Sequence, residues 1–186
     1  MSGHDPVSIL VLLLVIAAGA SIVLYQVRTG VPPMSSSAAE AAAVIALLQH
    51  AGLPERPVIY DLGSGWGSLV VALALAFPHA EIRGVELSPL PYLVSRLRTR
   101  NLANVTLRRG DLYACDLTDA DAATCYLMPK SMPKLASLFD RALAAGTPVV
   151  SLSFWFRDRT AAASSTGAGL LGATALYYWL ARPRPQ

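Results

Sequence analysis

Metal ligands are scarce in this sequence. There are only two cysteines, Cys115 and Cys125, and their spacing matches no metal-binding or redox motif. The three histidines lie far apart, and no His-x-x-His or Glu-x-x-His pair occurs. We therefore expect no metal site, and we interpret the cysteines as ordinary buried thiols in a reducing compartment.

Charge is sparse as well. Charged residues make up 15% of the 186 positions, and apolar residues make up 54%. Both values depart from average soluble usage in the direction of a membrane segment or a densely buried sheet. The formal net charge is +3 and the pI is about 9.1, a weakly basic balance that predicts no nucleic-acid partner. The length leaves room for one domain and an appendage.

Near the N-terminus, residues 7–25 form a run of nineteen positions without charge or proline. A helix of that length spans about 28 Å, close to the roughly 30 Å hydrocarbon core of a bilayer. A buried helix of a soluble protein is a weaker interpretation, because the segment is apolar on all sides. A cleaved signal peptide is the main alternative. It favours a positive start and a shorter apolar run, whereas the first six residues carry Asp5 and no Lys or Arg.

The first positive residue, Arg28, follows this apolar run directly. The positive-inside rule then places the rest of the chain in the cytoplasm. We therefore predict a single-pass membrane anchor over residues 1–30, with the following domain on the cytoplasmic side. The membrane would be the bacterial inner membrane, or a mitochondrial one in a eukaryote.

Residues 31–56 are expected to form a linker and one helix. The segment 31–33 is Val-Pro-Pro, which is stiff and extended. Ser37 and Glu40 match a capping box, in which each side chain bonds an amide of the other's turn. The capped helix should run to about Gln49.

From residue 57 to residue 186 the pattern alternates between strands and helices. We expect strands at 57–60, 81–86, 105–109, 122–127, 148–156 and 175–181, and helices at 69–77, 89–100 and 132–143. Alternation with apolar strands predicts an α/β domain with a Rossmann-like, doubly wound, mostly parallel sheet of about six to seven strands, preceded by one transmembrane helix. The aromatic residues at 154–156 and 177–179 should lie on two paired C-terminal strands, or alternatively at the membrane interface.

Three acidic residues follow successive strands at the edge where such sheets bind ligands. Asp61 ends the first strand and precedes Gly63 and Gly65, which let the backbone pass close beneath a ligand. An ammonium group could donate to Asp61, both hydroxyls of a ribose could donate to Glu86, and an adenine amino group could donate to Asp111. S-adenosylmethionine has all three groups, so the pattern predicts this cofactor.

Two other interpretations of these residues fit less well. A dinucleotide fingerprint would read Gly-x-Gly-x-x-Gly, but here Ser68 stands at the last glycine position. An acid directly before the turn would also repel a pyrophosphate. In a purely structural interpretation, the glycines form a tight turn and the acids cap helices. This explains each acid alone, but it explains poorly why all three stand at strand ends.

The constellation resembles class I, seven-strand methyltransferases. It is most similar to the membrane-anchored lysine methyltransferases that trimethylate the c subunit of ATP synthase and the adenine nucleotide translocase, and to their prokaryotic relatives. The resemblance covers roughly residues 31–157 and rests on the capped helix and on the runs 60–65, 84–89, 109–112 and 126–129. This sequence departs from the family at Trp66, where many members have a smaller or acidic residue, and in the apolar stretch 161–173.

The resemblance also implies roles for individual residues. The implied cofactor-binding residues are Asp61, Gly63, Ser64 and Gly65 at the methionine end, Glu86 and Leu87 at the ribose, and Asp111 and Leu112 at the adenine. Residues 126–129, with Tyr126 and Pro129 as the candidate catalytic residues, would lie beside the target amine.

The implied activity is methylation of lysine side chains on a membrane-associated protein. A lysine nucleophile must be neutral, and a channel formed by Tyr126, Pro129 and Trp155 would lower its pKa by desolvation. Two alternatives stay open: a methyltransferase for a lipid, quinone or other small molecule, and a catalytically inactive cofactor-binding module. The arginines at 96–109 would form a solvated surface, or contact anionic head groups or an acidic partner.

Overall fold

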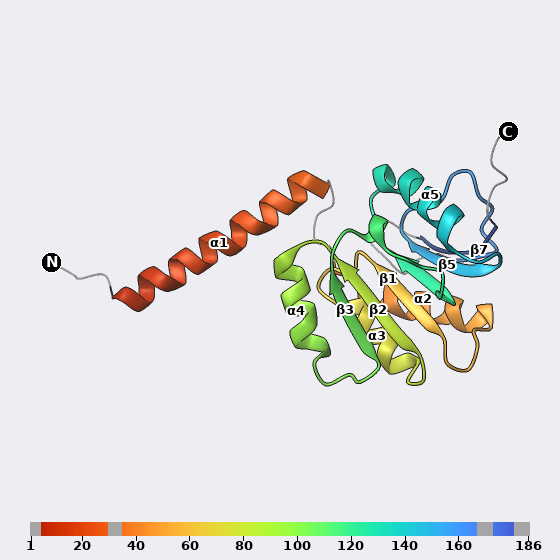
Figure 1. Ribbon diagram of the computed structural model, residues 1–186, viewed down its shortest axis with the longest axis horizontal. Helices are drawn as coiled ribbons and strands as arrows, with labels where there is room; N and C mark the ends of the chain where they lie inside the picture. The colour runs from red at the N-terminus through yellow and green to blue at the C-terminus, as the bar shows by residue number, and fades with distance from the viewer. Residues whose placement is uncertain (1–4, 30–34, 167–172, 181–186) are drawn as a thin grey trace.

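The structure is a computed structural model that describes residues 5–29, 35–166 and 173–180 (Figure 1). The expected Val-Pro-Pro linker at 31–33 therefore lies outside the described residues. The described chain contains a sheet of seven strands in the order β3-β2-β1-β4-β5-β7-β6. The strands are β1 (Val58–Leu62), β2 (Glu81–Glu86), β3 (Val105–Arg109), β4 (Ala122–Cys125), β5 (Thr147–Leu152), β6 (Ala163–Thr166) and β7 (Ala173–Trp179).

Strands β1 to β5 pair in parallel, and β7 pairs antiparallel with both β5 and β6. The predicted Rossmann-like, mostly parallel sheet is thereby confirmed. The chain reverses its strand order next to β1, because β2 and β3 lie on one side of it and β4 and β5 on the other. A crevice forms at such a switch point, outside the carboxyl ends of the strands.

Helices cover both faces of this sheet (Figure 1). The helices of the domain are α2 (Ala38–Ala51), α3 (Ser68–Ala76), α4 (Pro89–Thr99) and α5 (Met132–Ala142). Buried residues of α2 and α3, such as Leu48 and Leu73, share one core with Ile59 of β1. On the opposite face, Phe139 of α5 packs with Trp179 of β7. The domain thus has two separate apolar cores, one on each face of the sheet.

Helix α2 begins where the capping box predicted. The backbone amide of Glu40 donates to Ser37 Oγ at 3.2 Å, and the amide of Ser37 donates to Glu40 Oε2 at 2.7 Å. The helix ends at Gly52, which has a φ of 71° and so takes the left-handed conformation that favours glycine.

Two predicted strands end earlier than expected. The strand predicted over 122–127 ends at Cys125, which is level with Leu62 at the end of its neighbour β1. The strand predicted over 148–156 ends at Leu152, because Ser153 has a φ of 61° and turns the chain out of the sheet.

The aromatic residues at 154–156 were consequently misplaced on a strand. Phe156 still enters the core, where its ring centroid lies 5.3 Å from that of Tyr177 and 4.9 Å from that of Trp179. The sequence analysis also missed β6, which lies inside the small-residue stretch 161–173. Its Ala-Ser-Ser-Thr sequence carries little strand signal, and pairing with β7 at the edge of the sheet makes it a strand.

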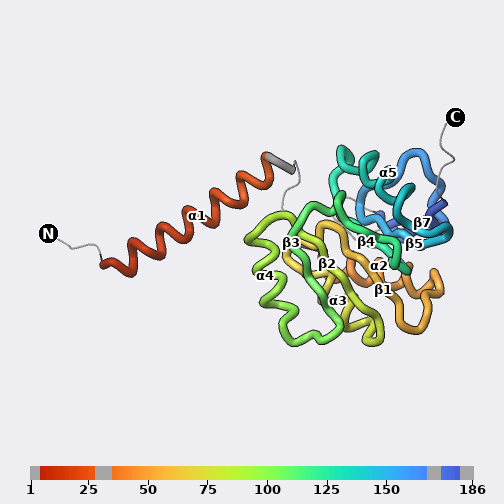
Figure 2. Tube along the Cα trace, in the orientation of Figure 1, coloured from red at the N-terminus to blue at the C-terminus, as the bar shows by residue number. Residues whose placement is uncertain are grey.

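Helix α1 (Pro6–Thr29) projects away from the sheet, as Figures 1 and 2 show. Its segment Pro6–Val27 is long and apolar enough to cross a membrane. Most of its side chains are exposed. The partly covered ones are Ala18, Ser21, Ile22 and Tyr25, whose spacing places them on one face of the helix. Through this face the last turns of α1 reach the domain next to α4.

Candidate functional site

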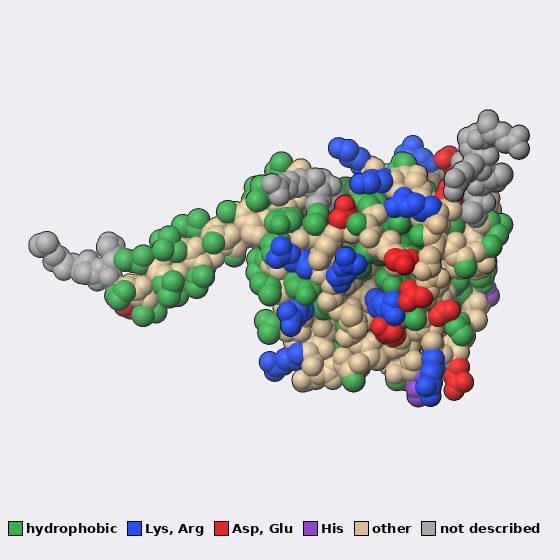
Figure 3. Space-filling view, viewed as in Figure 1, with side chains coloured by type: hydrophobic (Ala, Val, Ile, Leu, Met, Phe, Trp, Pro, Cys, Tyr) green, Lys and Arg blue, Asp and Glu red, His purple; other side chains and the backbone are tan. Residues whose placement is uncertain are grey.

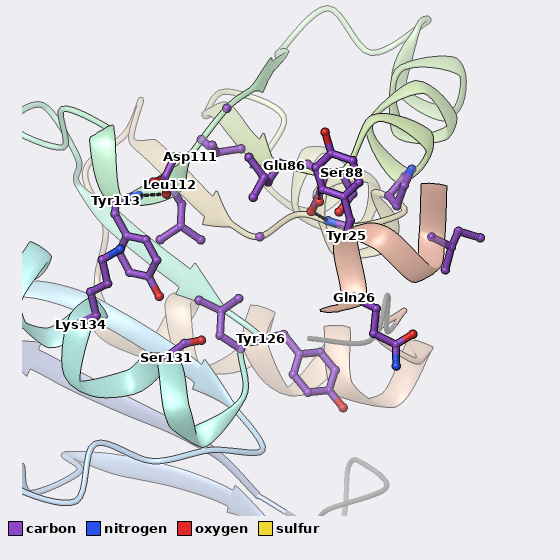
Figure 4. A pocket seen from close by; sticks show the side chains of 18 of the residues that line it. Tyr25, Gln26, Glu86, Ser88, Asp111, Leu112, Tyr113, Tyr126, Ser131 and Lys134 are labelled. Atoms are coloured by element: carbon purple, nitrogen blue, oxygen red, sulfur yellow. Dashed lines mark hydrogen bonds between the residues drawn. The ribbon is translucent and has the colours of Figure 1, made fainter. Parts of the chain in front are cut away.

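A cavity of about 300 Å³ opens at the carboxyl ends of the central strands. Each of four neighbouring strands contributes lining residues from its last positions or from the segment directly after it. These residues include Gly63 and Gly65 after β1, Glu86 and Leu87 after β2, Asp111 and Leu112 after β3, and Tyr126 and Leu127 after β4. Most of the residues predicted for the cofactor therefore meet in one place (Figure 4).

The loop after β1 forms the floor of this cavity. Gly63 has a φ of 82° and Gly65 a φ of 52°, both in the left-handed region. A Cβ on Gly63 would lie 2.8 Å from Leu127 Cδ2, so a side chain there would fill space between the loop and the cavity wall. The amides of Gly63 and Ser64 donate to Val85 O at 2.9 and 3.0 Å, which holds the loop against β2.

Glu86 connects the loop to the end of β2. Its Oε2 accepts from the amide of Gly65 at 2.9 Å, and its Oε1 accepts from the amide of Ser88 at 2.7 Å. These two bonds fix the direction of the carboxylate at the cavity wall. Each oxygen keeps lone-pair capacity for a further donor, so the carboxylate can still accept from a ligand.

Asp61 lies beneath the loop and is not one of the residues that line the cavity. The register of β1 with β4 places Thr124 beside it, and Thr124 Oγ1 donates to Asp61 Oδ1 at 2.9 Å. Burial raises the pKa of the Asp61 carboxyl to about 7; the Thr124 hydrogen bond lowers it, and the nearby negative charge of Glu86 raises it further. Its direct hydrogen bond to a ligand stays a prediction.

Ser64 is also buried. Within the part of the chain that the structure describes, its hydroxyl has no hydrogen-bonding partner. Ser64 is not one of the residues that line the cavity, and its side chain lies against β2, where a Cβ on Gly84 would be 3.1 Å from Ser64 Oγ. Its contact with the cofactor stays a prediction.

Asp111 lines the cavity and also caps the short 3-10 turn η1 (Leu112–Ala114). Its Oδ1 accepts from the amide of Tyr113 at 2.9 Å, as expected of an acid that caps a turn. Tyr113, which the sequence analysis missed, lines the same cavity, and Lys134 Nζ lies 3.8 Å from its ring centroid. In the sequence, the position of Tyr113 directly after the predicted adenine-binding residue Leu112 was the feature that could have indicated this.

Tyr126 and Pro129 were expected together at the target amine, but they line different hollows. Tyr126 lies in the large cavity, and its hydroxyl donates to Glu40 Oε1 at 3.2 Å. Pro129, at the start of the 3-10 turn η2 (Pro129–Ser131), lines a separate hollow with Ser153 and Trp155. Burial raises the pKa of Tyr126, and the negative charge of Glu40 adds to this.

The last turns of α1 contribute an unexpected wall of the cavity. Ser21, Ile22, Tyr25 and Gln26 line it together with the strand ends. Figure 4 shows Tyr25 beside Glu86 and Ser88. The sequence analysis treated this segment only as an anchor, because a uniformly apolar helix shows no face that would predict a contact with the domain.

Both cysteines are free and buried, as expected, and burial raises the pKa of Cys125 to about 12. Among residues 5–29, 35–166 and 173–180, no three His, Cys, Asp or Glu side chains are grouped so as to hold a metal ion.

Comparison with known families and proteins gives consistent matches. The family model described as the ANTKMT methyltransferase domain matches residues 61–163. A protein-lysine N-methyltransferase of Saccharolobus islandicus is 27% identical over 120 residues, which cover 60% of this chain and 71% of that protein. A release factor glutamine methyltransferase of Geobacter sulfurreducens is 43% identical over 61 residues, but these cover only 32% of this chain and 22% of that protein.

Solved structures share the fold. An RNA methyltransferase from Salinibacter ruber in complex with S-adenosyl-L-homocysteine is 26% identical, with a TM-score of 0.67, over 82% of this chain and 98% of that one. A precorrin-6y C5,15-methyltransferase from Geobacter metallireducens, at 16% identity and a TM-score of 0.56, covers 75% of this chain and 86% of its own.

Proposed function

The chain belongs to the ANTKMT methyltransferase domain family, and from that premise we propose that it methylates lysine side chains of a protein held at a membrane. It is an S-adenosylmethionine-dependent methyltransferase, as the family and the structural neighbour with S-adenosyl-L-homocysteine indicate. Lysine as the acceptor is supported by the similarity to an enzyme named for protein-lysine methylation.

The residues around the cavity fit the cofactor chemically. The loop with Gly63 and Gly65 leaves room for a ligand, and the carboxylate of Glu86 is held in place with lone pairs free for a further donor. We assign the methionine end to the loop and to Asp61 beneath it. Residues 86–87 would hold the ribose, and residues 111–112 would hold the adenine.

When bound, the cofactor supplies a methyl group already activated on a sulfonium, so the protein mainly has to position the two reactants. The acceptor nitrogen must be neutral to form the new N–C bond as the S–C bond breaks. The rings of Tyr25 and Tyr126 at the cavity wall would desolvate an entering lysine and lower its pKa, and the proton leaves to solvent.

The observation that carries the membrane part is that α1 lines the same cavity as the strand ends. An anchor joined by a long flexible tether would leave the distance between site and bilayer open. Here the side chains of the apolar helix are part of the cavity wall, so an acceptor entering the cavity must approach close to the membrane surface. Arg28, which directly follows the apolar span Pro6–Val27 within α1, favours the cytoplasmic side, where the methyl donor is made.

The test is to incubate membranes that contain the protein with tritium-labelled S-adenosylmethionine. We expect label in the protein fraction, released after acid hydrolysis as methylated lysine, and none with Gly63→Ala. Label in the organic extract would instead identify a lipid or quinone acceptor. Cofactor binding without any transfer would identify an inactive binding module.

A further inference from the structure

The outer face of α4 has an unusual composition for a helix on a sheet. Leu93 and Leu97 are 53% and 64% exposed and lie four residues apart, so they are neighbours on one face. The inner face is instead formed by Pro91, Ser95 and Thr99, which are buried.

Small residues are required on this inner face. A Cβ on Gly67 would lie 2.3 Å from Ser95 Oγ, which shows how closely α4 approaches the start of α3. Within the described chain, therefore, the two exposed leucines contribute little to the core. A contact with something outside the domain would better explain why Leu93 and Leu97 are exposed.

Positive charge surrounds these leucines. Residues 87–110 contain five arginines and no acidic residue. Arg98 is used within the domain, where it donates to Trp66 O and Ser68 Oγ, both at 3.1 Å. Arg96 and Arg100 are exposed beside the leucines, and Arg108 and Arg109 are exposed on β3, the edge strand next to α4. Figure 3 shows basic side chains along this edge of the domain, whereas most acidic ones gather farther from α1.

The position of α4 relative to α1 sets how close α4 lies to the bilayer. The first turn of α4, with Ser88 and Pro91, lines the same cavity as residues 21–26 of α1. The 24 residues of α1 extend about 36 Å, slightly more than the roughly 30 Å of a hydrocarbon core. If α1 spans a bilayer, its last turns lie at the head groups, and α4 must lie there too.

We propose that α4 and the β3 edge form a lipid-contact face that lies on anionic head groups. The face consists of Leu93, Leu97, Arg96 and the C-cap Arg100 of α4 and of Arg109 of β3, which lies on the same side of the sheet as Val105 and Leu107. Leucines flanked by arginines are the pattern of helices that lie in a membrane interface, where the apolar side chains enter the acyl boundary and the cations meet anionic lipid. This inference rests on the proposed membrane span of α1. Its consequence is that the cavity keeps one orientation toward the membrane surface.

The experiment uses the full chain reconstituted in vesicles, with Leu97→Cys labelled by an environment-sensitive fluorophore. Vesicles contain phosphatidylcholine alone or with phosphatidylglycerol, and lipids spin-labelled near the head group act as quenchers. We expect strong quenching at position 97 that increases with the anionic lipid. The matched control is Leu75→Cys on α3, which is 67% exposed but has no arginine cluster beside it, and we expect no quenching there.

A second variant, Arg96→Gln with Arg100→Gln, should lose the dependence on anionic lipid. Equal quenching at positions 97 and 75 in a chain that stays in the vesicles after alkaline carbonate would overturn the lipid-contact face alone. Quenching at position 97 that does not change with the content of anionic lipid would also overturn the lipid-contact face. Release of the wild-type chain by carbonate would instead show that α1 does not span the bilayer, which contradicts the membrane part of the proposed function.

Discussion

Among single residues, Asp61 has the most unusual environment. Its carboxyl is buried beneath the glycine loop, and burial raises its pKa from about 3.8 to about 7. With this value the carboxyl of the folded apo-protein is mostly protonated at pH 6 and about half protonated at pH 7. An ammonium group arriving near Asp61 would favour the charged carboxylate and expel that proton.

We therefore expect proton release when S-adenosylmethionine binds at pH 6. Isothermal titration calorimetry in two buffers of different ionisation enthalpy should show binding heats that differ, because each buffer takes up the released proton with its own enthalpy. The affinity for S-adenosylmethionine should rise between pH 5 and 7. Asp61→Asn should bind more weakly and show no buffer dependence. Identical heats in both buffers for the wild type would contradict a contact between Asp61 and the ammonium group of the cofactor.

Asp61 should also make the stability of the apo-protein depend on pH. A carboxyl whose pKa is raised on folding favours the folded state fully below its unfolded pKa, about 3.8, and this contribution is lost as pH rises through about 7. At about 1.4 kcal/mol per pKa unit, the loss is at most about 4 kcal/mol. Urea unfolding between pH 5 and 8 should show wild-type stability falling relative to Asp61→Asn. Parallel pH profiles would contradict the raised pKa.

Glu40 joins the helix cap to the cavity, because one carboxylate oxygen accepts from Ser37 N and the other from Tyr126 Oη. Glu40→Ala should lower kcat, since Tyr126 keeps its side-chain hydrogen bond with Ser153 but loses the one to Glu40. Tyr126→Phe, which removes both bonds, should lower kcat at least as much. Ser37→Ala is the matched control. It removes the cap at a cost of about 1 kcal/mol but leaves Tyr126 held. Equal loss of activity in Ser37→Ala and Glu40→Ala would reduce Glu40 to a capping role.

At the scale of elements, the loop between β1 and α3 gives the sharpest test of the cavity. Gly63→Ala would place a methyl group 2.8 Å from Leu127 in a left-handed backbone conformation. Gly146→Ala has the same backbone strain, at a φ of 88°, but meets no atom within 4 Å. Both variants should lose about 1 kcal/mol or more in thermal unfolding. Only Gly63→Ala should lose cofactor binding by calorimetry, and binding at wild-type affinity would place the cofactor elsewhere.

At the scale of the whole molecule, the proposed membrane span of α1 can be tested directly. Ile16→Arg places a charge in the middle of the apolar span Pro6–Val27, which costs about 2.5–3.5 kcal/mol for insertion. We expect this variant to move from the carbonate-resistant pellet to the supernatant, whereas Leu75→Arg in the domain stays in the pellet. A purified wild-type chain whose mass shows an N-terminus after α1 would instead identify a cleaved signal sequence.

The sequence alone determined the features that depend on neighbours along the chain. The uncharged run at 7–25 forms one helix, Ser37 and Glu40 cap the next, and apolar segments alternate as the strands and helices of the sheet. The glycine turn with the acids at 61, 86 and 111 predicted a cofactor edge, because parallel strands end at the same side of a sheet.

Tertiary structure decided what depends on partners far along the chain. Strand β4 ends level with its neighbour β1, and β6 exists because β7 pairs with it. The bond from Tyr126 to Glu40 joins residues 86 positions apart, and burial rather than residue type gives Asp61 its raised pKa. The contribution of α1 to the cavity belongs here too, because a helix that is apolar on every side does not show in its sequence which face will meet the domain.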